Sequence, residues 1–496
     1  MRVLERAASA ACIAALIAGP CASAETLNDA IALAYQTNPT LQAERAQLRA
    51  TDEEYVQARA GYRPTADIAA SYTYDNNEAG LFGPTVSNTT NGAVQISQPL
   101  YTGGRVAAEV DAAKADILAG REGLRRAEIG VLQNVIGAYL DVRRDQEQLT
   151  ISQDNVNVLS RQLDETNGRF DAGQLTRTDV AQSQARLAQA KSQLASAQAS
   201  LAVARAAYAA VVGQNPGDLA PEPPIASLLP ASVDAAFDDA EKANPQLLQA
   251  NYVEQSSAAK LAQAKALTRP TVGLTGSYGY TGGAESISGL LSGLGSSGGP
   301  FSNYARDVTV SVSAKAPLFA GGMYASQIRQ AAEADNVSRI GVESARRQVL
   351  QAVSQAWNQL LGARAGLTAD EETVRSDTVA FEGVREEQKV GLRTILDVLN
   401  AQQELETSQL ALVGARHDEY VAAAAVLSAI GSLEAKDLIP AEPRYDPKAN
   451  FEKVKHAPGW VPWEGAIEAI DHVGAPVPTP APPPSEPGEV IKTQDR

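Results

Sequence analysis

The sequence contains little sulfur: two cysteines and two methionines among 496 residues. Both cysteines, Cys12 and Cys21, stand in a segment with basic residues, an apolar run and Ala22-Ser23-Ala24, a pattern typical of a secretory signal. We expect residues 1–24 to be removed, which leaves the exported chain no thiol for a disulfide, a metal ion or a nucleophile. The alternative, a lipid anchor on Cys21, is disfavoured because Pro20 stands where a small residue is needed.

Residues typical of catalytic and metal sites are scarce too. The three histidines, His417, His456 and His472, show no ligand spacing, and the scarcity of methionine weighs against a role in handling copper or silver. A GxGxxG and a GxSxG pattern overlap within 293–299, but this stretch is low-complexity glycine and serine with no helix predicted after it. We therefore predict a protein that is not an enzyme, with no catalytic residue, no cofactor and no metal site.

Long hydrophobic runs and an excess of positive charge are absent as well. Beyond the signal, no segment approaches the about 18 continuous apolar residues of a membrane-spanning helix, so any membrane crossing must use strands. The formal net charge is -16, and removal of Arg2, Glu5 and Arg6 with the signal makes it -17. Such acidity opposes nucleic-acid binding, and we predict no nucleic-acid partner.

What the sequence does contain is an internal duplication. Asn38-Pro39 recurs as Asn244-Pro245 at an offset of 206 residues, and Pro99 to Gly104 recurs as Pro317 to Gly322 at an offset of 218. The 12 extra residues fall in the second copy, where the sequence has the glycine- and serine-rich stretch 281–300. Further pairs at these offsets are Arg63-Pro64 with Arg269-Pro270, Gly173 with Gly391, Asp179 with Asp397, and Gly213 with Gly431.

Each copy has two segments in which apolar and polar residues alternate, and these predict strands. They lie near 65–76, 92–100, 271–282 and 306–318. A period of two is typical of a barrel strand with lipid outside and water inside, and about 9 to 11 residues suffice to cross a bilayer. A soluble sheet packed on a core gives the same alternation, so both interpretations remain open at this point.

The rest of each copy is predicted to be helical, in helices too long for a globular core. Between Gly104 and Glu165 the chain has 62 residues without proline, a rod of about 93 Å at roughly 1.5 Å per residue. From Leu187 to Val211, leucine, alanine and other apolar residues recur at heptad spacing, which predicts a coiled coil.

Two glycine-containing turns, 168–175 and 389–392, are predicted to join the helices, because glycine supplies the left-handed residue that ends a helix. The first copy is thus predicted to contain a helix at 25–60, a strand hairpin, a long helix, a turn and a helix at 177–212. The second copy is predicted to repeat this order. All hairpins then lie at one end and both turns at the other. We predict the first repeat at 25–213, a linker at 214–231, the second repeat at 232–431, and a Pro-rich tail at 432–496, extended and disordered. The alternative for this tail is contact with the outside of the helical part through Trp460 and Trp463.

Four strands per chain are too few for a closed barrel. An open sheet edge in lipid leaves backbone groups unpaired at a cost of several kcal/mol each, and the smallest common barrel has about eight strands. The chain must therefore oligomerise. The strand count alone permits a dimer, a trimer or a tetramer.

With these features, the chain resembles the TolC-like outer-membrane factors over about residues 25–435. The resemblance is carried by the duplicated helix-strand-strand-helix unit, the stretch Ala58 to Pro64, the paired Asn-Pro, and the stretch Val390 to Asn400. It implies a mainly α fold with a transmembrane β-barrel: a homotrimer with a 12-stranded barrel in the outer-membrane lipid and a long coiled-coil barrel of helices in the periplasm. It also implies the exit duct of a tripartite system for type I protein secretion or multidrug efflux.

The resemblance also implies partners and a gate. The partners are a periplasmic adaptor (membrane fusion) protein and an inner-membrane pump of the ABC or RND type. The gate lies at the turn end, where Arg393 should pair with Asp179 and Thr178 and hold one coiled coil against its neighbour. Gln388 stands where the family has a tyrosine of this network, and it can hydrogen-bond but not stack.

Two further sets of residues follow from the resemblance. The two carboxylates that face the pore in the family fall on Asp397 and Asn400, so only the first is charged here, and a ring of Asp397 carboxylates would favour cations. Residues of the two turns should dock the adaptor. These are Ala172, Gly173, Gln174, Val390, Gly391 and Leu392.

The alternative function is a non-conducting trimeric coiled-coil surface protein, similar to an adhesin, in which the strands form a small anchor and the helices a stalk. It predicts one stalk per chain and one strand cluster. Two copies that fold back at turns favour the duct. The cargo is left open between secreted polypeptide and small molecules, because a shared conduit need not recognise what it carries.

Overall fold

A computed structural model describes residues 24–77, 85–287, 304–438, 444–455 and 459–476. Residues 1–23 of the expected secretory signal, His456 and the glycine-rich stretch 293–299 lie outside these residues. The chain divides into two compact units, each built from both repeats. The turn unit comprises Met1–Glu44, Arg125–Pro245 and Gln348–Arg444, and the sheet unit comprises Arg45–Leu124, Gln246–Arg347 and Tyr445–Arg496.

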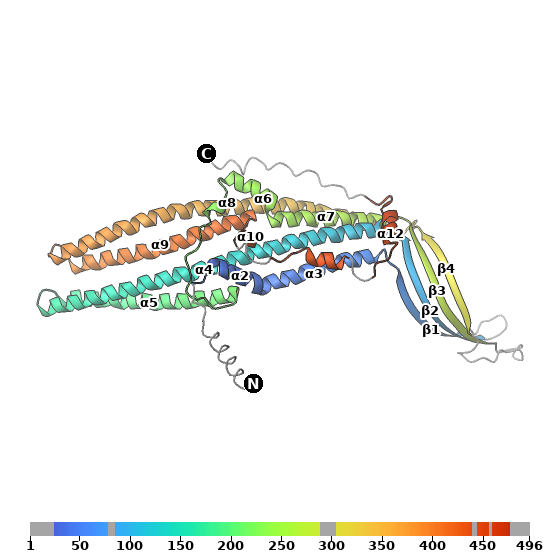
Figure 1. Ribbon diagram of the computed structural model, residues 1–496, viewed down its shortest axis with the longest axis horizontal. Coiled ribbons are helices and arrows are strands. Elements are labelled where there is room, and N and C mark those ends of the chain that lie inside the picture. Colours follow the sequence, from blue (N-terminus) through green and yellow to red (C-terminus); the bar gives the residue numbers. More distant parts are fainter. Residues whose placement is uncertain (1–23, 78–84, 288–303, 439–443, 456–458, 477–496) are drawn as a thin grey trace, which may run out of the picture. The chain divides into compact units, whose positions relative to one another are not determined.

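Eight helices of the described residues follow the duplication (Figure 1). Those of the first repeat are α2 (Leu27–Thr37), α3 (Pro39–Ala60), α4 (Arg105–Asp171) and α5 (Arg177–Val212), and those of the second are α6 (Val233–Ala243), α7 (Pro245–Ala266), α8 (Met323–Lys389) and α9 (Ile395–Ile430). The helix expected at 25–60 is therefore two helices. Asn38 ends α2 in extended backbone, and Pro39, which has no N–H to donate, begins α3.

The heptad pattern predicts which side chains of α5 are buried, and several of them are buried within the single chain. Leu187, Ala190, Leu201, Ala204 and Tyr208 are buried. By length and composition alone, α5 also passes as a helix that could cross a membrane, the one such helix among the described residues. Its burial along one seam indicates helix-to-helix packing as the reason for this composition.

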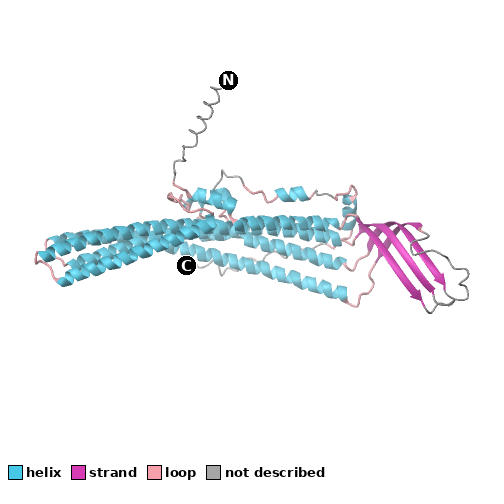
Figure 2. Ribbon diagram, turned by 90° about the horizontal axis from the view of Figure 1, so that it is seen from below, coloured by secondary structure: helices cyan, strands magenta, loops and turns pink. Residues whose placement is uncertain are grey.

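The four strands form one antiparallel sheet in the order β1-β2-β3-β4 (Figures 1 and 2). Their bounds are β1 (Thr65–Asn77), β2 (Thr85–Tyr101), β3 (Thr271–Ile287) and β4 (Ala305–Lys315). The two hairpins share one register, because Thr65 lies opposite Ser97 and the equivalent Thr271 lies opposite Lys315. The strands lie where alternation predicts them, although β2 begins at Thr85, earlier than expected.

The register sorts the side chains of the sheet into two faces. One row across the four strands is Ile68, Val94, Tyr278 and Val308, and the next row, on the opposite face, is Asp67, Gln95, Ser277 and Thr309. The apolar face is open to the surroundings: Ile68 is 84% exposed and Val310 is 74% exposed. A sheet packed on a soluble core would bury these side chains, so the exposure favours the lipid-facing interpretation of the alternation.

The prediction of an extended, disordered tail after 432 is wrong for its described residues. Three helices form there: α10 (Ala435–Leu438), α11 (Ala449–Val454) and α12 (Glu464–His472). Ile467 of α12 and Phe451 of α11 join the core around Tyr55, Tyr62 and Val106 in the sheet unit. Each of α11 and α12 has an apolar side chain that packs on this core, which gives these segments a reason to fold.

Candidate functional site

The two helical turns of the turn unit are built alike. Gly173 and Gly391 have φ of 74° and 81°, the left-handed region that glycine adopts without strain. The N–H of Gln174 donates to Arg169 O at 2.9 Å, and the N–H of Leu392 donates to Glu387 O at 2.9 Å. These bonds satisfy the last carbonyls of α4 and α8, so both helices end where the glycine pattern predicts.

An aspartate locks the start of the helix after each turn. Oδ2 of Asp179 accepts from the N–H and Oγ1 of Thr176, both at 2.8 Å. In the second repeat, Oδ2 of Asp397 accepts from the N–H of Thr394 at 2.9 Å and from its Oγ1 at 2.8 Å. The backbone N–H of each aspartate in turn donates to the threonine Oγ1, which completes a capping box. The Thr-x-x-Asp spacing is a signal that sequence reasoning could have used.

The capping boxes also fix the charge of both aspartates. The backbone N–H of Thr176, followed by its hydroxyl, lowers the pKa of Asp179. The same groups of Thr394 lower the pKa of Asp397, with a smaller contribution from Arg393. Both side chains are therefore carboxylates at neutral pH, held at the positive end of a helix dipole.

The proposed gate residues lie around these turns, but one chain does not bring all of them together. Arg393 donates from Nε to Glu387 Oε2 at 2.8 Å, and this bond raises the pKa of Arg393. Thr178 is exposed, and Gln388 is buried near the end of α8. Within the chain, Arg393 thus pairs across its own turn. The expected pairing of Arg393 with Asp179 and Thr178 stays a prediction about neighbouring coiled coils.

Asn400 is held by a residue that sequence reasoning missed. Arg186 of α5 donates from Nη2 to Asn400 Oδ1 at 3.1 Å, and its Nη1 donates to Oε1 of Gln403. These bonds connect α5 of the first repeat to α9 of the second. Arg186 belongs to no motif, and 214 residues separate it from Asn400, so no local pattern in the sequence points to this contact.

Next to this contact, α9 packs on α4 and α5 through an apolar layer and a polar layer. The apolar layer contains Leu159, Leu187, Ala190, Ile395 and Leu399. In the polar layer, Gln402 Nε2 donates to Asn155 Oδ1 at 3.1 Å. A small cavity in this layer is also lined by Glu406 and Arg186.

Glu406 is the acidic residue of that polar layer. Its side chain is 5% exposed, and burial raises its pKa. Among the described residues, Oε1 of Glu406 has no hydrogen-bond partner. A carboxylate in this position disfavours its own ionised form, because burial removes water that would solvate the charge.

The comparison with protein families identifies this architecture. The family model described as "Outer membrane efflux protein" matches residues 30–214 and 236–432, nearly all of both repeats. The chain is also 34% identical over 442 residues to the outer membrane efflux protein BepC of Brucella suis biovar 1 (strain 1330), covering 89% of this chain and 92% of BepC. The chain belongs to the outer membrane efflux protein family.

Other members of the family are more distant. The outer membrane protein TolC of Escherichia coli (strain K12) is 28% identical over 422 residues, which cover 84% of each chain. The alkaline protease secretion protein AprF of Pseudomonas aeruginosa is 27% identical over 329 residues, or 65% of this chain and 66% of AprF.

Solved structures of two membrane proteins have the same fold. The outer membrane protein VceC of Vibrio cholerae superposes with a TM-score of 0.68 at 22% identity, covering 82% of this chain and 96% of VceC. A membrane protein from Pseudomonas aeruginosa superposes with a TM-score of 0.72 at 20% identity, covering 83% of this chain and 92% of that one. The predicted TolC-like family, its fold class, its outer-membrane location and its function as an efflux channel are thus confirmed.

Proposed function

We propose that this outer membrane efflux protein works as a homotrimer, the exit duct of a tripartite export system. Its partners are a periplasmic adaptor (membrane fusion) protein and an inner-membrane pump of the ABC or RND type. The observation that carries the proposal is the sheet of the single chain, with an exposed apolar face, a polar opposite face and outer strands β1 and β4. Three copies supply twelve strands, with apolar side chains toward the outer-membrane lipid and polar side chains toward water.

The proposed channel closes at the turns. Arg393 of one coiled coil pairs with Asp179 and Thr178 of its neighbour, beside the buried amide of Gln388. Asp397 forms a ring of three carboxylates that favours cations at the aperture. Two observations support this assignment: the capping boxes hold Asp179 and Asp397 ionised in fixed positions, and the Arg186 contact holds Asn400 beside them.

The adaptor docks at the two turns. The second turn offers apolar side chains to solvent, since Val390 is 72% exposed and Leu392 is 75% exposed. The first turn offers Ala172, Gly173 and Gln174, all exposed. A tip with two exposed aliphatic residues suits a protein partner, because burying them against another surface removes apolar area from water.

For the cargo, the family members point to two uses of one duct. AprF is named for the secretion of a protease, and BepC for efflux. We infer that this channel serves type I protein secretion, small-molecule efflux, or both, with the pump selecting the cargo. A conduit lined by polar residues needs no binding site for either.

Conductance of the purified protein in planar lipid bilayers tests the duct against its alternative, a non-conducting adhesin-like trimer. A duct gives single-channel steps that are cation-selective. A trimer that stays non-conducting across voltage and pH, also after Arg393→Ser, supports the adhesin. Comparing the secreted proteome and the drug sensitivity of a deletion strain then assigns the cargo.

A further inference from the structure

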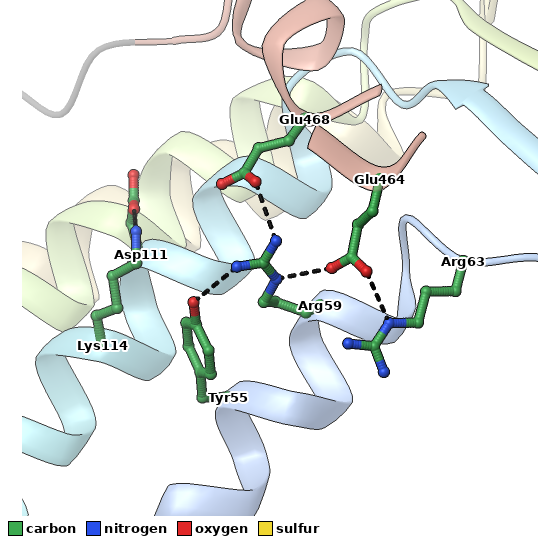
Figure 3. Close-up of polar contacts among 7 residues, drawn as sticks. All are labelled: Tyr55, Arg59, Arg63, Asp111, Lys114, Glu464 and Glu468. Atoms are coloured by element: carbon green, nitrogen blue, oxygen red, sulfur yellow. Dashed lines mark hydrogen bonds and ion pairs between the residues drawn. The ribbon is translucent and has the colours of Figure 1, made fainter. Parts of the chain in front are cut away.

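The C-terminal residues 445–455 and 459–476, here called the clamp, are held on the first repeat by two fully buried carboxylates. Glu464 accepts from Arg59 Nε at 2.8 Å and from Arg63 Nε at 3.2 Å, and Glu468 accepts from Arg59 at 3.1 Å (Figure 3). Both Glu464 and Asp471 are 0% exposed. Because an unpaired buried charge is costly, these pairs fix where the clamp can bind.

Asp471 binds the start of α4. Its carboxylate accepts from the N–H of Thr102 at 2.6 Å and from the N–H of Gly104 at 3.2 Å, and Thr102 Oγ1 donates to it as well. These N–H groups precede the first turn of a 67-residue helix and have no partner within it. In the second repeat, Ala320 replaces Thr102 and cannot donate a side-chain hydrogen bond. The side-chain bond to Asp471 is therefore available only in the first repeat.

The clamp lies on the apolar face of the sheet. Trp463 donates from Nε1 to Gln98 Oε1 at 3.1 Å. Gln98 lies opposite Leu274, in a row of the apolar face. The clamp thus covers the helix-proximal end of this face, beside Arg63, the residue that leads into β1.

Next to the sheet, the two repeats of one chain also meet where the segment after β2 packs against the segment before β3. A Cβ on Gly103 would lie 2.8 Å from Arg269 Cβ, so these backbones are in close contact. The equivalent Gly321, after β4, has no atom within 4 Å of such a Cβ. Nearby, Leu318 is 97% exposed and Phe319 is 88% exposed. The second repeat therefore has an uncovered surface where the first repeat has a contact.

The duplication indicates which residues of a second copy cover this exposed surface of the second repeat. Tyr101 lies opposite Val272 across the boundary between the repeats. The residue equivalent to Tyr101 in the second repeat, at the offset of 218, is Phe319, and the residue equivalent to Val272 in the first repeat, at the offset of 206, is Ala66. Phe319 of one copy then lies opposite Ala66 of the partner subunit, as β4 pairs with β1 of that copy. The contact of Gly103 with Arg269 converts in the same way to Gly321 with Arg63 of the partner subunit. Arg63 is the residue that the clamp binds through Glu464.

We infer that the clamp is part of the contact between subunits, and that its exposed tryptophan, Trp460, covers Phe319 of a second copy of this chain. Trp460 is 61% exposed and follows Gly459, whose Cβ position lies 3.2 Å from Arg63 Nη1. Each copy then contributes one clamp to one seam between subunits. This inference rests on the proposed homotrimer, so the experiment must distinguish the absence of the clamp contact from the absence of the homotrimer.

Engineered disulfides provide that separation, because both native cysteines, Cys12 and Cys21, lie in the segment predicted to be removed as a secretory signal. Ala70→Cys with Ala314→Cys reports on the pairing of β1 with β4, since the pair Ile96 and Gly276 converts to these positions. Trp460→Cys with Phe319→Cys reports on the clamp. Both pairs should give disulfide-linked dimers and trimers on non-reducing gels after mild oxidation of outer membranes.

The outcomes differ for the two proposals. If the strand pair links and the clamp pair does not, the inference about the clamp is overturned while the oligomer stands. If neither pair links, the oligomer itself is wrong, and the inference with it. Trp460→Cys with Val337→Cys is the matched control, since Val337 is 68% exposed on α8, and it should give no product.

Truncation gives a second measurement. A chain ending at Arg444 lacks the whole clamp, whereas one ending at Pro476 keeps every described residue of it. The shorter chain should lose its heat-resistant trimer at a lower temperature on gels, with the helix content by circular dichroism reduced only by the missing segment. Equal heat resistance of the two trimers would contradict the inference.

Discussion

Arg186 of α5 reaches across the turn unit to Asn400 of α9, with 3.1 Å between Nη2 and Oδ1. The family resemblance places a second pore carboxylate at Asn400. This chain has instead a neutral amide whose oxygen is bonded to a cation from the other repeat. We expect α5 and α9 to separate when the proposed aperture widens, so Arg186 is a candidate for the gate in addition to Arg393.

Replacing Arg186 should therefore favour the open channel. Arg186 donates two hydrogen bonds to α9, and each contributes about 0.5 to 1.5 kcal/mol, so removing both should change the ratio of open to closed states about fivefold or more. Arg186→Gln should raise single-channel open probability in planar bilayers. Lys191→Gln, an exposed cation on the same helix, is the control. An unchanged open probability for Arg186→Gln would show that Arg186 has no role in closure.

Arg393→Ser should also raise conductance, because it removes the proposed bond between neighbouring coiled coils. The observed pair with Glu387 offers a competing explanation. Glu387→Gln removes that local pair and leaves Arg393 available to Asp179, so it should not raise conductance. If Glu387→Gln has the same effect as Arg393→Ser, the local pair is responsible and the latch between subunits is wrong. Arg375→Ser, 73% exposed on α8, controls for loss of positive charge.

The selectivity of the aperture should change little with pH over the neutral range. The Thr394 backbone N–H holds the pKa of Asp397 below its ordinary value of 3.8. Because the pKa is lowered, the charge is present above 3.8 and is lost only as the pH falls through the lower value. Reversal potentials in a salt gradient should agree between about pH 5 and pH 7. A loss of cation preference by about pH 5 would mean that another group sets the selectivity.

Adding charge at the second pore position should strengthen this preference. Asn400→Asp restores a carboxylate in each copy, so the ring gains three negative charges and cation selectivity should rise. Gln403→Glu is the matched control, since Gln403 also accepts from Arg186 but is not a pore residue in the family resemblance. If cation selectivity rises more for Gln403→Glu than for Asn400→Asp, Gln403 and not Asn400 lies at the aperture.

Glu406 should make the turn unit less stable as the pH rises. Burial raises its pKa in the folded chain, so the unfolded chain loses this proton first, and stability falls as the pH rises from the ordinary value of 4.5 through the higher folded value. Below the ordinary value the effect is absent. Glu406→Gln should then raise the melting temperature at about pH 7 and leave it nearly unchanged at about pH 4.

The small cavity beside Glu406 is lined by neutral amides and one cation, which makes this prediction specific. These polar groups include the amides of Asn155 and Gln402 and the guanidinium of Arg186. Glu404→Gln, an exposed carboxylate two residues away, should change the melting temperature little at either pH. If Glu406→Gln raises the melting temperature equally at both pH values, the effect comes from packing and not from charge.

Much of the fold is readable from local pattern. Alternation predicts the strands, the glycines of the turns predict where α4 and α8 end, and the Asn-Pro pairs carry the signal for the break between α2 and α3. These features are informative because a period, a left-handed residue or a missing N–H acts within a few residues of the chain.

The clamp and the bond to Asn400 could not be predicted in this way. Asp471 is buried because Thr102, 369 residues away, donates to it. Arg186 sits on a helix face that looks solvated until α9 packs beside it. In a Pro-rich segment with few apolar residues, the local signal favours an extended chain, and only the distant partners outweigh it.

The capping boxes divide the two proposed pore positions into one that is fixed and one that can vary. In the proposed aperture Asp397 carries the charge, and it also caps the start of α9, so removing it would fray a helix at the same time as it changed selectivity. Asn400 takes no part in the capping box of its own helix. A lineage or an engineer adapting this duct to new cargo could therefore retune the aperture at Asn400 while the helix ends stay intact.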